Sequence, residues 1–139
     1  MRYVEDIAKL GMADAEEAGG KGANMGEMVS AGLPVPPGFV VLRDSYLESV
    51  IGAGVADDLN AAHREAMRAG DQDKQTEMCT AMKALVLRAG MSAEVRDRIL
   101  AAYRAMGSNV NVAVRSSATG EDGADASFAG MNATFTNIC

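Results

Sequence analysis

The sequence predicts an α+β fold in which several helices pack on a small mixed or antiparallel sheet. The middle of the chain consists of amphipathic helical stretches separated by glycines, with apolar residues at i, i+4 and i+7. Short runs of apolar and β-branched residues stand on either side of it, at 39–42 and 109–115. The length of 139 residues fits one domain, or one part of a larger protein.

The first third of the chain predicts two strands on either side of a glycine-rich loop and a helix. The GGKG run at 19–22 gives the backbone freedom at successive positions, so we expect a loop there. A helix should follow from Ala23 and stop at Gly32. The prolines of LPVPPG forbid a helix and favour a turn into a short buried strand. The two strands are expected within residues 2–10 and 39–42.

The remainder of the chain predicts four helices followed by two strands. Asp44 is a suitable N-cap for the first helix, and glycines follow the first three. The alternation of polar residues and valines at 109–115 predicts a strand, and MNATFTNIC at the end is also typical of one. Between these strands lies a long segment rich in Gly, Ser and Ala, expected to be a loop. The four helices are expected at 44–52, 56–69, 73–89 and 92–106.

The composition excludes several classes of function. A net charge of −6 and a pI near 4.7 argue against non-specific nucleic-acid binding and against docking to anionic lipid. The sequence has no apolar stretch long enough for a membrane span and no secretory signal profile at its start. Two cysteines cannot form a disulfide framework, so we expect a cytoplasmic protein.

The glycine-flanked Lys21 is the first candidate for a binding site. Amides at the start of a helix and a mobile ammonium group together suit a phosphate. The segment is not a P-loop, because that pattern needs Gly where Ala15 stands and Ser or Thr where Gly22 stands. Taken alone, GGKG also fits a turn before a helix that carries a solvated lysine.

Arg115 is the second candidate, at the end of a strand predicted to be buried. An unpaired guanidinium there would be costly, so it should face an anion, either a bound phosphate or one of the nearby acids Glu121 and Asp122. Glycines in the following segment suit a loop that wraps its amides around an anion. The role of the acids, with Asp125, stays open. Hydroxyl donors are supplied by Ser116, Ser117 and Thr119.

The remaining candidates are weaker. His63 lies mid-helix beside Arg64 and Glu65 and is expected to be a surface side chain, and Cys79 is expected to be a helix-packing residue. No second His or Cys stands at metal-ligand spacing, so we expect no zinc site.

Two blocks carry a resemblance to a known family. They are GGKGANMGEMVSAGLPVPPGFVV at 19–41 and VAVRSSATGEDGADASFAGMNATFTNI at 112–138. Together they resemble the N-terminal ATP-binding region of phosphoenolpyruvate synthase (pyruvate, water dikinase) and related dikinases. The form SSATGED followed by ASFAG is more similar to phosphoenolpyruvate synthases and rifampicin phosphotransferases than to pyruvate, phosphate dikinases. The helical middle, about 43–108, is unspecific.

The resemblance implies an ATP-grasp-type fold in which ATP lies between two subdomains. Residues 1–139 would form the first subdomain of a larger multidomain enzyme. In the family, the lysine of GGKG and the arginine of VRSS contact the ATP phosphates, which maps catalytic roles onto Lys21 and Arg115. The loop that closes over the phosphates maps onto Gly130, Met131, Asn132 and Thr134.

The resemblance also implies partners outside this chain. Members of the family use ATP to phosphorylate a histidine on a separate domain, which passes the phosphate to pyruvate or another acceptor. That histidine is not His63, and the Mg²⁺ ligands should lie in a second ATP-grasp subdomain beyond Cys139, so the isolated chain is expected to be inactive. Two alternatives stay open: a rifampicin phosphotransferase-type enzyme, and a stand-alone, non-catalytic module that binds nucleotide or a partner.

Overall fold

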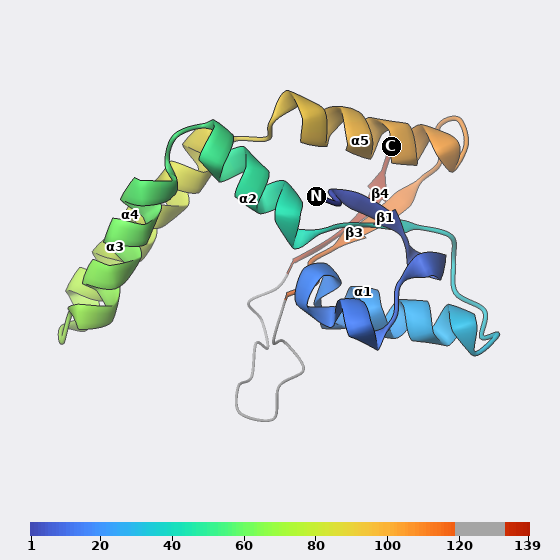
Figure 1. Cartoon of the computed structure of the whole chain (residues 1–139), viewed down its shortest axis with the longest axis horizontal. Helices are drawn as coiled ribbons and strands as arrows, with labels where there is room; N and C mark the ends of the chain where they lie inside the picture. Colours follow the sequence, from blue (N-terminus) through green and yellow to red (C-terminus); the bar gives the residue numbers. More distant parts are fainter. Residues whose placement is uncertain (119–132) are drawn as a thin grey trace. The chain divides into compact units, whose positions relative to one another are not determined.

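The computed structural model describes residues 1–118 and 133–139 and confirms the α+β class (Figure 1). The chain divides into two units, one made of residues 1–45 and 97–139, the other of residues 46–96. In the described residues, the strands form two antiparallel pairs.

The first strand pair and the helix between its strands form the core of the first unit. β1 pairs with β2 so that Val4 lies opposite Val41. The buried residues Leu10, Ala18 and Leu42 cluster together, and Val40 packs against them. The strand expected to be buried is only half-buried at Phe39 and Val40 and exposed at Val41. The elements are β1 (Val4–Asp6), the 3₁₀ turns η1 (Ile7–Lys9) and η2 (Met12–Asp14), α1 (Ala15–Ser30) and β2 (Phe39–Val41).

The end of α1 confirms the predicted helix stop. Gly32 has a φ of 73°, a left-handed conformation that closes the helix. The Leu33 amide donates to the Met28 carbonyl at 3.0 Å, which satisfies one of the last carbonyls of the helix.

An arginine connects the N-terminal segment to the start of α1. The Arg2 guanidinium donates to Asp14 at 2.6 Å and to Glu17 at 2.9 Å. The hydrogen bond from Arg2, followed by one from the Gly11 amide, holds the pKa of the Asp14 carboxyl below its ordinary value.

The second strand pair brings the two ends of the SSAT-containing block together. β3 (Val112–Arg115) pairs antiparallel with β4 (Thr134–Ile138), and Arg115 lies opposite Thr134. The Tyr103 hydroxyl, on α5 (Ala93–Ala105), donates to the Val110 carbonyl at 2.7 Å just before β3. The expectation that Arg115 closes a buried strand is wrong: its side chain is exposed, because in the described residues only β4 lies beside β3.

The second unit is helical. α3 and α4 pack against each other, and the Ser92 amide donates to the Ser49 hydroxyl at 3.2 Å. Asp71 caps α4 by accepting from the Asp73 amide, and Gly90 follows the last turn with a φ of 63°. The predicted helices are confirmed, but Asp44 is not the N-cap of the first of them, because that helix already begins at Arg43 and Asp44 lies in its first turn. α2 (Arg43–Gly52) lies mostly in the second unit, and α3 (Ala56–Arg68) and α4 (Gln72–Ala89) lie wholly in it, whereas most of α5 (Ala93–Ala105) belongs to the first unit.

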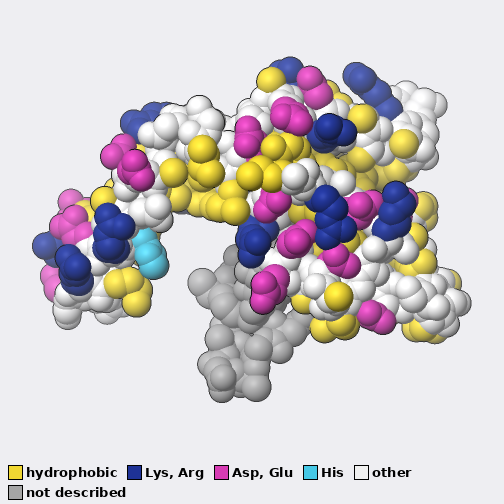
Figure 2. All heavy atoms as spheres, viewed as in Figure 1, with side chains coloured by type: hydrophobic (Ala, Val, Ile, Leu, Met, Phe, Trp, Pro, Cys, Tyr) yellow, Lys and Arg dark blue, Asp and Glu magenta, His cyan; other side chains and the backbone are white. Residues whose placement is uncertain are grey.

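The surface of each unit carries charges of both signs. Figure 2 shows acidic and basic side chains interspersed on the visible face of each unit. Among the described residues, no helix combines the length and apolar character that a membrane crossing requires.

Candidate functional site

The GGKG segment is helical, which corrects the predicted loop at 19–22. It lies inside α1, where Gly19 alone leaves the helical conformation, with φ 74° and ψ 165°. The helix therefore has a short first part that ends at Ala18 and a second part that begins at Gly20. Glycines have a poor intrinsic helix propensity, so tertiary contacts must hold this segment in place.

Those contacts come from the residues that follow β3. The Gly20 amide donates to the Ala118 carbonyl at 3.3 Å, and the Gly22 amide donates to the Ser117 hydroxyl at 3.0 Å. The same hydroxyl donates to the Ala18 carbonyl at 2.7 Å. The expectation that amides at the start of this helix are free for a phosphate is thus wrong for Gly20 and Gly22.

Gly19 lies directly against Ser117. A Cβ atom on Gly19 would stand 2.5 Å from the Ser117 hydroxyl oxygen and would clash with the Ser117 carbonyl. The φ of 74° is itself unfavourable for a residue with a side chain. Glycine is therefore required at this position both for its backbone conformation and for the close approach of the two segments.

The structure brings together the segments that carry Lys21, Arg115 and Thr134. Lys21 is half-buried on α1, between the two glycines whose amides bond to Ser117 and Ala118. Arg115 ends β3 two positions before Ser117, and Thr134 is its partner on β4. The candidate loop residues Gly130, Met131 and Asn132 lie outside the described residues, as do the acids at 121, 122 and 125.

This arrangement suits a polyanionic ligand. The two cations come from elements far apart in the sequence, and charge-assisted hydrogen bonds from such groups are the stronger kind. The Arg115 guanidinium offers several donors to phosphate oxygens, whereas Lys21 offers a compact ammonium group. The Thr134 hydroxyl adds a neutral donor opposite Arg115.

Sequence reasoning missed the structural role of Ser117. It identified this residue only as one of three hydroxyl donors near Arg115. The signal that could have found it is the combination of a glycine-rich helix start, whose amides need acceptors, with small hydroxyl residues in the second block.

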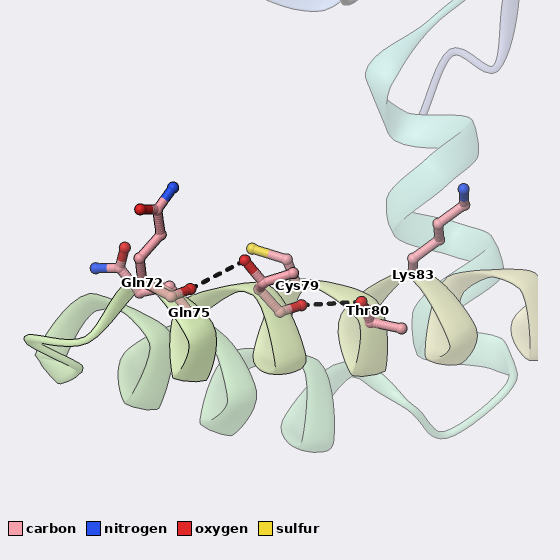
Figure 3. Close-up of a pocket in the computed structure, with 6 residues that line it drawn as sticks. Gln72, Gln75, Cys79, Thr80 and Lys83 are labelled. Carbon is pink, nitrogen blue, oxygen red and sulfur yellow. Dashed lines mark hydrogen bonds between the residues drawn. The ribbon is translucent and has the colours of Figure 1, made fainter.

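A shallow hollow of about 430 Å³ lies on α4. Figure 3 shows its side chains along one face of that helix, where the Thr76 and Thr80 hydroxyls donate back to carbonyls of the same helix. Cys79 is exposed here, so the expectation that it packs within the fold is wrong. No charged groups from different elements meet at this hollow, and it is a weaker candidate. It is lined by Gln72, Gln75, Thr76, Cys79, Thr80 and Lys83.

Two further features concern metals and histidine. His63 is exposed on α3, as expected. Within residues 1–118 and 133–139, no three His, Cys, Asp or Glu side chains gather as a metal site would require.

Comparisons with known proteins identify the family of this chain. The pyruvate phosphate dikinase AMP/ATP-binding domain family matches residues 15–139. A probable phosphoenolpyruvate synthase of Methanocaldococcus jannaschii is 38% identical over 99% of this chain and 12% of its own length. The phosphoenolpyruvate synthase of Pseudomonas aeruginosa is 38% identical over 99% of this chain and 18% of its own. The phosphoenolpyruvate synthase of Aeropyrum pernix is 39% identical over 86% of this chain and 15% of its own length.

The chain spans less than a fifth of the length of these three relatives. Both blocks of the candidate site fall within the matched residues. The chain belongs to the pyruvate phosphate dikinase AMP/ATP-binding domain family.

Proposed function

We propose that this chain is the ATP-binding part of a phosphoenolpyruvate synthase-like phosphotransferase. In this proposal, residues 1–139 form the first subdomain of an ATP-grasp nucleotide-binding domain, and a second subdomain completes the ATP cleft. The observation that carries the proposal is the junction of the GGKG segment with the end of β3, made by hydrogen bonds from Gly20 and Gly22. The family and the names of the relatives support it.

At this junction Lys21 and Arg115 bind the ATP phosphates. Their positive charges offset the charge of the triphosphate and hold the transferring phosphoryl group for in-line attack. Mg²⁺ bound together with ATP would neutralise part of the phosphate charge. We place the carboxylate ligands of that metal outside residues 1–139.

The phosphoryl group passes to a histidine on a separate domain of the same protein. A ring nitrogen of that histidine forms a bond to the β-phosphorus of ATP while the bond between that phosphorus and the oxygen of AMP breaks, so AMP leaves. The terminal phosphoryl group then passes to water as inorganic phosphate. Pyruvate then takes the phosphoryl group, as the names of the relatives suggest. The exposed His63 on α3 has no part in this transfer.

Radiolabel transfer from ATP tests the reaction in the whole protein that contains this chain. We expect ³²P from the β position of ATP to appear on the protein as an acid-labile, alkali-stable phosphohistidine, and pyruvate to remove it as phosphoenolpyruvate. His63→Asn should label as fully as the wild type. Release of the label only by rifampicin would replace pyruvate with that acceptor, and a protein that binds ATP without any labelling would contradict the phosphotransferase assignment.

A further inference from the structure

The two cationic side chains of the proposed site lie on separate elements, so contacts between those elements must fix their relative position. Lys21 is on α1 and Arg115 ends β3. Two of the hydrogen bonds that join these elements pass through one atom, the Ser117 hydroxyl oxygen. A third runs from the Gly20 amide to the Ala118 carbonyl and is the longest, at 3.3 Å.

The Ser117 hydroxyl bonds to both sides of the break in α1. Its proton goes to the carbonyl of Ala18, the residue before Gly19, at 2.7 Å. Its lone pair accepts from the amide of Gly22, the residue after Lys21, at 3.0 Å. A hydroxyl can do both at once, whereas a methyl group can do neither. The bonds are partly shielded from water, which makes their loss more costly than at an exposed site.

We infer that Ser117 is a positioning residue that fixes Lys21 relative to Arg115 for phosphate binding. The inference rests on the proposed function. Ser117 acts through the backbone on either side of the lysine, and its hydroxyl is already occupied by two backbone groups. Misplacement of a binding group by about 1 Å can cost about a hundredfold in rate.

The test compares Ser117→Ala and Ser117→Thr in the whole protein. We expect Ser117→Ala to lower the turnover with ATP by about tenfold to a hundredfold and to weaken Mg-ATP binding, because Lys21 loses its fixed position. Ser117→Thr keeps the donor and the acceptor and should restore most of the turnover. Wild-type turnover in Ser117→Ala would overturn the inference and leave the proposed function standing.

Ser45→Ala is the matched control for stability. The Ser45 hydroxyl is also partly buried in the first unit and donates to the Tyr3 carbonyl at 2.6 Å, outside the proposed phosphate site. We expect it to lower the unfolding midpoint to a similar degree while ATP turnover stays within about twofold. An equal loss of turnover in Ser45→Ala and Ser117→Ala would reduce Ser117 to a structural role. A wild type that binds no ATP would instead contradict the proposed function.

Discussion

Alanine in place of Arg115 is expected to remove at least about 99% of the phosphoryl transfer from ATP, because a charged group that stabilises the transferring phosphate is typically worth a hundredfold or more. The side chain is exposed at the end of β3, so the free energy of unfolding should change by no more than about 0.5 kcal/mol. Lys21→Ala should have the same effect on transfer, with a somewhat larger loss of stability because Lys21 is half-buried. The measurement is single-turnover transfer of ³²P beside urea unfolding of each variant.

Two controls separate the role of the site from a general loss of charge. Lys9→Ala removes an exposed lysine of the same unit, paired with Glu5 at 3.4 Å, and should leave transfer unchanged. Arg115→Lys keeps the charge but loses the planar set of donors, so it should retain part of the rate. Full transfer in Arg115→Ala would remove this residue from the phosphate site.

Among single glycine-to-alanine substitutions at the site, Gly19→Ala is expected to lower the free energy of unfolding the most. It places a Cβ atom against Ser117 and forces a residue with a side chain into φ 74°. The backbone strain costs about 1–3 kcal/mol, and displacement of Ser117 adds to it, for a total of roughly 3–5 kcal/mol. ATP binding should fall together with stability, because Ser117 lies two residues after Arg115 and its displacement would also move the end of β3.

Gly32→Ala provides the matched comparison, measured by urea unfolding of both variants. Gly32 has nearly the same φ, 73°, but a Cβ atom there would meet no atom within 4 Å. It should cost about 1–2 kcal/mol, the penalty for a left-handed residue alone, and leave ATP binding intact. The difference between the two variants combines the contact of Gly19 with Ser117 and the added backbone cost of the Gly19 ψ of 165°, which essentially only glycine adopts at positive φ. Equal losses in both would show that this contact contributes nothing.

The helices could be predicted because their signals are local. The apolar periodicity and the glycines at 32 and 90 act within a few residues, so they can be recognised from the sequence alone. The turn after the prolines and the strand at 39–41 follow from equally local chemistry.

The helical conformation of the GGKG segment could not be predicted, because the residues that accept hydrogen bonds from its amides are distant in the sequence. GGKG reads locally as a loop, and it is helical because the Ser117 hydroxyl and the Ala118 carbonyl accept from its amides. Likewise, the exposure of Arg115 depends on which elements cover β3, and valine alternation does not report that. The pairing of Lys21 with Arg115 as one site came from the family resemblance. The contacts between their segments now supply a physical reason for it.

Hydrogen–deuterium exchange of the whole protein, with and without saturating Mg-ATP, tests the central claim most directly. The claim is that the ATP phosphates bind where the GGKG segment meets the end of β3. We predict slower exchange in peptides that cover α1 and residues 112–118, and unchanged exchange in peptides from α4, which serve as the internal reference. If the protein binds ATP while both site segments exchange at their unliganded rates, the phosphates bind elsewhere and the account is wrong.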